Sequence, residues 1–158
     1  MMGAGKSVTA QLLAGRLGIP HYDTDETVVA EAGMPIVEIF RVQGEGEFRR
    51  LESDAVAAIA ESPPGVVATG GGVVLDAASV ARMRGSGRVV LLDTPVAEII
   101  TRVGDGSRPL IDLEGGETVS TIREQRRSAY AEAADITVDT AGMSPGQVAD
   151  EVERLCGS

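Results

Sequence analysis

Residues 3–7 read Gly3-Ala4-Gly5-Lys6-Ser7 and match the C-terminal part of the phosphate-binding pattern G-x-x-x-x-G-K-[ST]. Glycines let successive backbone N–H groups turn towards phosphate oxygens, and the positive end of the following helix reinforces the binding of an anion. We expect Lys6 to reach the β- and γ-phosphates of a nucleotide and the Ser7 hydroxyl to ligate Mg²⁺. The alternative is a glycine-rich helix start with an exposed lysine. The pattern favours an ATP site.

The match to this pattern is incomplete at its N-terminal side. The first glycine of the pattern would lie one residue before Met1, and the strand that feeds such a loop in doubly wound folds is not among these residues. Burial of about five apolar side chains contributes on the order of 10 kcal/mol, which is comparable with the ~5–15 kcal/mol net stability of a whole domain. We therefore expect a sheet without its first, central strand, and a 158-residue chain that is poorly soluble or partly unfolded and binds ATP weakly.

Composition limits the function classes that remain. The 158 residues carry a formal net charge of −10 and are 43% hydrophobic, which fits one globular domain and argues against broad nucleic-acid binding. No apolar run approaches the roughly 20 residues of a membrane span. Lys6 is the only lysine, and a compact ammonium fits between phosphate oxygens better than a planar guanidinium. One cysteine, Cys156, excludes an internal disulfide framework, and we interpret Cys156 and His21 as structural. The composition predicts a cytoplasmic domain.

Apolar patterning along the chain alternates between short strands and helices, which predicts an α/β fold with a parallel sheet. Glycine-rich residues 104–116 are predicted to form a mobile loop. Asp76 can cap one helix, and Ser144 with Gln147 matches a capping box for the last one. The strands are expected near 19–22, 66–68, 88–93 and 136–138, and the helices near 6–17, 26–32, 35–42, 45–60, 76–83, from 94, 117–133 and from 144.

Further motifs follow the phosphate loop in a fixed order and at specific spacings, and with them the chain resembles the shikimate kinase family of the nucleoside-monophosphate-kinase-like group. The resemblance covers essentially the whole chain. It implies a three-layer αβα P-loop kinase fold with a parallel sheet and a single domain over 1–158, with a substrate-binding segment at about 24–60 and a lid at about 104–116. The motifs are Asp23-Thr24-Asp25, Phe48-Arg49-Arg50-Leu51-Glu52, Gly70-Gly71-Gly72-Val73, Arg108-Pro109-Leu110, and Arg126 four residues before Tyr130.

The reaction that this resemblance implies is transfer of the γ-phosphoryl of ATP to the 3-hydroxyl of shikimate, with Mg²⁺ as a cofactor. Asp23 resembles the residue that holds Mg²⁺ through water, and Asp25 the residue that orients the substrate hydroxyl and takes its proton. The two aspartates are two residues apart at a strand end, so both side chains can face one crevice. The alternative for the pair is a helix N-cap with a solvated neighbour.

Arg49 and Arg126 resemble the residues that bind the shikimate carboxylate, and guanidinium groups match a planar carboxylate in charge and geometry. The alternative for Arg49 is a salt-bridged helix surface, because Glu45, Glu47 and Glu52 surround it in the sequence; we expect this surface role for Arg50 and Arg127. The three glycines 70–72 would let the backbone approach the substrate closely, and the alternative is a plain turn.

On the nucleotide side, Arg108 resembles the lid arginine that closes on the transferring phosphate, and Arg102 resembles the arginine that stacks on adenine. Pro145 fits the adenine-side loop 140–145, although this loop lacks an arginine that some relatives have. Residues 127–129 also lack a proline that often precedes the tyrosine. The resemblance thus implies a nucleotide site formed by Gly3, Ala4, Gly5, Lys6, Ser7, Arg102, Arg108 and Pro145.

Two other functions remain open at this stage. A gluconate-type or other small-molecule kinase would share the phosphate loop, whereas Arg49, Arg126 and the triple glycine favour shikimate. A non-catalytic kinase-like binding protein would fit a missing first strand, whereas retention of Lys6 and Asp25 speaks against it. We expect a monomer that binds a small-molecule substrate and neither nucleic acid nor membrane.

Overall fold

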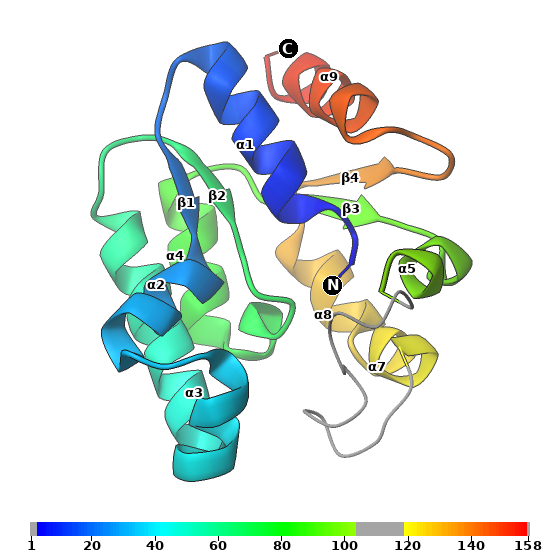
Figure 1. Ribbon diagram of the computed structural model, residues 1–158. Coiled ribbons are helices and arrows are strands. Elements are labelled where there is room, and N and C mark those ends of the chain that lie inside the picture. Colours follow the sequence, from blue (N-terminus) through cyan, green and yellow to red (C-terminus); the bar gives the residue numbers. More distant parts are fainter. Residues whose placement is uncertain (1–2, 104–118, 158) are drawn as a thin grey trace.

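The computed structural model describes residues 3–103 and 119–157, in which helices surround short parallel strands (Figure 1). None of the described helices is long and apolar enough to cross a membrane. The elements are α1 (Lys6–Leu17), β1 (His21–Asp23), α2 (Thr24–Ala32), α3 (Ile36–Ala60), β2 (Val66–Ala68), the 3₁₀ helix η1 (Val73–Leu75), α4 (Ala77–Ser86), β3 (Val90–Asp93), α5 (Val96–Val103), α7 (Val119–Gln125), α8 (Arg127–Ala133), β4 (Ile136–Asp139) and α9 (Pro145–Cys156).

The strands pair in parallel, as the sequence predicts. β1 pairs with β2 so that Asp23 lies opposite Ala68, and β3 pairs with β4 so that Asp93 lies opposite Asp139. Within the described residues these pairs form two separate two-stranded sheets. Helix α1 contacts β1 and β2 on one side and α9 on the other, and so connects the two halves (Figure 1).

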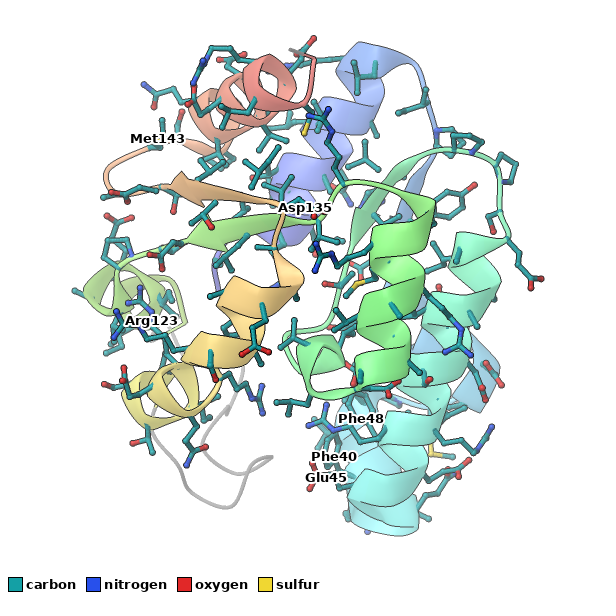
Figure 2. All side chains as sticks on the ribbon, turned by 180° about the vertical axis from the view of Figure 1, so that it is seen from behind. Phe40, Glu45, Phe48, Arg123, Asp135 and Met143 are labelled. Atoms are coloured by element: carbon teal, nitrogen blue, oxygen red, sulfur yellow. The ribbon has the colours of Figure 1, made fainter. Side chains whose placement is uncertain are left out.

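Two apolar clusters form the core of the described residues. In the first, α1 packs on β4 and α9. In the second, α2 packs on α3, and the rings of Phe40 and Phe48 on α3 lie 4.6 Å apart between centroids (Figure 2). Each fully buried side chain of this size contributes ~1.5–3 kcal/mol, so the second cluster fixes α3 firmly against α2. The buried members are Leu13, Val138, Val148, Ala149 and Val152 in the first cluster and Val28, Ile39, Phe48, Leu51 and Ala55 in the second.

Helix ends agree with the sequence in most places. The Asp76 carboxylate accepts hydrogen bonds from the backbone N–H groups of Ala78 and Ser79, and Ser144 with Gln147 forms the predicted capping box. α3 contains a non-helical residue, Gly44, at φ 84° and ψ 171°, so the predicted break between residues 42 and 45 is confirmed.

The single helix predicted over 117–133 is wrong within the described part of the chain. α7 ends at Gln125 and α8 begins at Arg127, because the backbone of Arg126 leaves helical geometry at φ −96° and ψ 2°. α7 is tied to the end of β3 by an ion pair between Arg123 and Asp93. Figure 2 shows Arg123 on α7, on the same side as β3. The break between α7 and α8 falls at Arg126, one of the two arginines that the sequence predicts to bind the substrate carboxylate.

Candidate active site

The phosphate-binding motif forms the turn that leads into α1. Gly3 and Gly5 have φ values of 76° and 80°, a backbone conformation that residues with a side chain rarely adopt. Gly5 is the N-cap of α1, so the N-terminal end of that helix opens onto the turn. Lys6 is the first residue of the helix. Burial lowers the pKa of Lys6, while the negative charges of Asp25 and Asp23 raise it. Lys6 and both aspartates therefore lie in one electrostatic environment.

Asp23 joins this turn to the end of β1. The Ser7 hydroxyl donates a 2.7 Å hydrogen bond to Asp23 Oδ2, and the backbone N–H of Asp25 donates to Asp23 Oδ1 at 2.9 Å. Asp23 thus caps α2 and is also hydrogen-bonded to the phosphate-binding turn, so the predicted N-cap is present and the role of Asp23 in holding Mg²⁺ stays a prediction. The side chain is 8% exposed.

A hydroxyl and a carboxylate at this place fit Mg²⁺, which prefers oxygen ligands and is often completed by waters and substrate phosphates. The described parts of the chain contain no group of three or more His, Cys, Asp or Glu side chains that could hold a metal ion. The oxygen atoms of Ser7 and Asp23 therefore suit a metal that arrives with a nucleotide better than a metal held by protein ligands alone.

Asp25 lies in the first turn of α2 and not on a strand, because β1 ends at Asp23 and the helix begins at Thr24. Strand alternation therefore does not determine how the two aspartate side chains are oriented, and the expectation that was based on it is wrong. The carboxylate of Asp25 instead lies against Gly70: a Cβ on that glycine would come within 2.8 Å of Asp25 Oδ1 and 2.6 Å of Glu52 Oε1.

Space favours glycine at positions 70 and 72, because side chains from other segments lie where a Cβ would be. A Cβ on Gly72 would lie 2.0 Å from Nη1 of Arg49, so a side chain there would displace the guanidinium. Neither glycine has a positive φ. Backbone conformation alone would admit other residues at both places. Close packing of charged side chains on the loop therefore favours glycine at both places, and the role of the loop in binding the substrate stays a prediction.

Arg49 is held in place by two carboxylates on α3. Its Nη1 donates to Glu52 Oε2 at 2.9 Å, and its Nη2 donates to Glu45 Oε1 at 3.1 Å. Glu52 is 4% exposed, and burial raises its pKa although Arg49 opposes this effect. Arg50 points to the surface, where it pairs with Glu47 and Asp54, so its predicted surface role is confirmed.

Arg126 reaches the same glycine loop from the other side of the site. Its Nη1 donates to the carbonyl of Gly71 over a long 3.5 Å, and the Tyr130 hydroxyl donates to that carbonyl at 2.8 Å. Arg127 is exposed and lies 3.8 Å from Glu124, which confirms its surface role. The structure thus brings Arg49, Arg126 and Asp25 to one loop, from α3, the α7–α8 break and α2 respectively.

Sequence reasoning assigned no role to Thr24 or Tyr130, although both belong to motifs that it singled out. Thr24 Oγ1 accepts a 2.8 Å hydrogen bond from the backbone N–H of Gly70. The ion pair between Arg49 and Glu52, three residues apart on one helix, is among those that the alternative for Arg49 expected. Arg108 lies outside the described residues, as does the side chain of Arg102, and Pro145 occupies the first turn of α9.

A family model described as shikimate kinase matches residues 2–156 of the chain. The chain belongs to the shikimate kinase family. The shikimate kinase of Salinispora arenicola is 44% identical to it over 154 residues, which cover 97% of this chain and 92% of that relative. The shikimate kinase of Persephonella marina is 39% identical over 152 residues, covering 96% and 92% of the two chains.

Solved structures of shikimate kinases have the same fold. The Acinetobacter baumannii enzyme in complex with shikimate superposes with a TM-score of 0.90 at 31% identity, covering 98% of this chain and 87% of that one. The Aquifex aeolicus shikimate kinase gives a TM-score of 0.81 at 32% identity, covering 98% and 90%. The predicted family, P-loop kinase fold and ATP-dependent activity in aromatic amino-acid biosynthesis are therefore confirmed for this shikimate kinase.

Proposed function

We propose that the glycine loop 70–72, with the side chains that lie against it, is the place where the γ-phosphoryl of ATP passes to the 3-hydroxyl of shikimate. One observation carries this proposal. Arg49 packs against Gly72 and Arg126 donates to the Gly71 carbonyl, so two guanidinium groups from separate helices flank a loop that also contacts Asp25. A substrate with one carboxylate and several hydroxyls matches this combination of charges.

The carboxylate of shikimate is placed between Arg49 and Arg126. Guanidinium groups bind carboxylates through charge-assisted hydrogen bonds that fix orientation as well as position. Glu52 and Glu45 hold Arg49 from its own helix, through Nη1 at 2.9 Å and Nη2 at 3.1 Å, and so fix the position of the guanidinium. The glycines at 70 and 72 leave room on the loop for the side chains of Asp25, Glu52 and Arg49, which would border the substrate.

Asp25 accepts the proton of the substrate hydroxyl as the bond from that oxygen to the γ-phosphorus forms and the bond to the bridging oxygen of ADP breaks. Lys6 binds the β- and γ-phosphates, since its ammonium lies at the start of α1 in the environment of both aspartates. Ser7 and Asp23 would hold Mg²⁺, which supplies positive charge that neutralises the phosphates. The side chains of Asp25, Lys6, Ser7 and Asp23 must already be in position when both substrates are bound, so that the γ-phosphoryl group can pass directly from one to the other.

The remaining assignments rest on the resemblance of the sequence. Arg108 closes on the transferring phosphate from the lid at 104–116, Arg102 stacks on adenine, and Pro145 borders the adenine. Gly3, Ala4 and Gly5 provide backbone N–H groups for the phosphates. We expect the protein to work as a monomer in the cytoplasm.

A coupled ADP-release assay with shikimate, gluconate and nucleoside monophosphates tests the proposal. We expect shikimate to be the preferred substrate, and Asp25→Asn serves as the background for hydrolysis of ATP by water. Equal or greater activity on gluconate would favour the gluconate-type alternative. Binding of shikimate without ADP release on any substrate would favour the non-catalytic alternative.

A further inference from the structure

The glycine loop 70–72 is held by two buried hydroxyl groups from different parts of the chain. Thr24 Oγ1 accepts from the Gly70 N–H at 2.8 Å, and the Tyr130 hydroxyl donates to the Gly71 carbonyl at 2.8 Å. Thr24 is 1% exposed and Tyr130 is 8% exposed. Hydrogen bonds in such places are expensive to leave unmade, so each one fixes the loop at a definite distance from its partner element.

Each hydroxyl belongs to the same element as one of the proposed substrate contacts. Thr24 directly precedes Asp25 in the first turn of α2. Tyr130 lies one helical turn after Arg126, and its backbone N–H donates to the Arg126 carbonyl at 2.9 Å. The first hydrogen bond therefore sets the distance from Asp25 to the loop, and the second sets the distance from Arg126 to the loop.

The Tyr130 hydroxyl also affects the guanidinium of Arg126. Both groups donate to the Gly71 carbonyl, Tyr130 over 2.8 Å and Arg126 over 3.5 Å. Without the phenol, that carbonyl would lose its short hydrogen bond, and Arg126 could satisfy it by moving closer. If the Arg126 guanidinium forms a shorter hydrogen bond to the backbone, fewer of its N–H groups are available for a substrate carboxylate.

We propose that Thr24 and Tyr130 are positioning residues for shikimate, an inference that rests on the proposed function of the loop. They touch neither substrate in this assignment. Thr24 keeps the loop in register with Asp25, and Tyr130 keeps the Gly71 carbonyl satisfied so that Arg126 is directed towards the substrate.

Isosteric variants of the full chain separate positioning from stability. Thr24→Val and Tyr130→Phe each delete a hydroxyl with little change in volume, Thr24→Ser restores one, and Tyr22→Phe is the matched control. Tyr22 is the other tyrosine of the chain, and its hydroxyl donates to the Pro63 carbonyl at 3.2 Å on the surface. The KM values for shikimate and ATP are measured together with kcat, shikimate affinity by calorimetry and thermal unfolding.

We expect Thr24→Val and Tyr130→Phe to raise the KM and Kd for shikimate about 3- to 10-fold, the effect of one hydrogen bond, with the KM for ATP within about twofold of wild type. Thr24→Ser and Tyr22→Phe should match the wild type. Equal changes in both KM values, or a lower Tm with an unchanged KM for shikimate, would overturn the proposal, as would the same effect from Tyr22→Phe. Should Thr24→Val fail to fold, Tyr130→Phe decides. Wild-type turnover on shikimate tests the proposed function separately.

Discussion

Nη1 of Arg49 lies so close to Gly72 that a Cβ at this glycine would come within 2.0 Å of it. The backbone at position 72 does not have a positive φ, so the close approach of Arg49, and not the turn, favours glycine at this position. The position of one proposed substrate contact is therefore fixed by the absence of a side chain in another segment.

Gly72→Ala is expected to displace the Arg49 guanidinium and raise the KM for shikimate at least several-fold, with the KM for ATP little changed. Steady-state kinetics with each substrate varied in turn measure the effect. Gly15→Ala is the control, because a Cβ at Gly15 on α1 meets no atom within 4 Å. An unchanged KM for shikimate in Gly72→Ala would show that Arg49 does not need this space.

Arg49→Ala should weaken shikimate binding about 10- to 150-fold, since a charge-assisted hydrogen bond contributes ~1.5–3 kcal/mol. ATP binding should change little. Isothermal titration of both ligands measures this, and Arg50→Ala is the control because Arg50 pairs with Glu47 and Asp54 at the surface. A similar loss for both ligands, or for both arginines, would contradict the assignment.

Asp23→Asn is expected to raise the Mg²⁺ concentration for half-maximal activity about 10- to 150-fold, the effect of losing one charge-assisted contact. The asparagine carbonyl can still accept the hydrogen bond from the Asp25 N–H that caps α2. Asp76→Asn is the matched control, since Asp76 caps α4 in the same way outside the site. The same Mg²⁺ requirement in wild type and Asp23→Asn would exclude Asp23 from the metal site.

Glu52 gives the stability of the fold a specific pH dependence. Burial raises the pKa of Glu52 above 4.5, so the folded protein binds a proton on this group more tightly than the unfolded chain. Its contribution to the free energy of unfolding is present below the ordinary pKa and is lost as the pH rises through the raised value. Wild type should therefore lose stability relative to Glu52→Gln over that range.

Urea unfolding of both variants at a series of acidic to neutral pH values measures this difference. Glu47→Gln is the control with the opposite sign, because the hydrogen bond from Arg50 lowers the pKa of Glu47. Stabilisation by Glu47 should be present above its ordinary pKa and lost as the pH falls. A pH-independent difference between wild type and Glu52→Gln would contradict the effect of burial.

Features with partners close in sequence could be predicted from the sequence. The cap at Asp76, the capping box at Ser144 and the break near Gly44 each depend on residues within a few positions, and all three are present. The glycine–lysine–serine turn is local as well. Short-range hydrogen bonds and local backbone preferences determine such features independently of the tertiary structure.

Features that depend on packing between elements could not be predicted in this way. Tyr130 and Gly71 are 59 residues apart, and Thr24 and Gly70 are 46 apart, so no local pattern marks either contact. The glutamates around Arg49 look equivalent in the sequence. Glu52 is buried against the distant Gly70, whereas Glu45 remains at the surface.

Asp25→Asn, measured for shikimate binding and for ADP release on the same preparation, tests the central claim most directly. If Asp25 accepts the proton of the substrate hydroxyl, shikimate should bind by calorimetry with nearly wild-type affinity, while shikimate-dependent ADP release falls about 10²- to 10⁴-fold. Thermal unfolding verifies that the variant is folded. Turnover close to that of wild type, or a loss of binding as large as the loss of turnover, would contradict the claim.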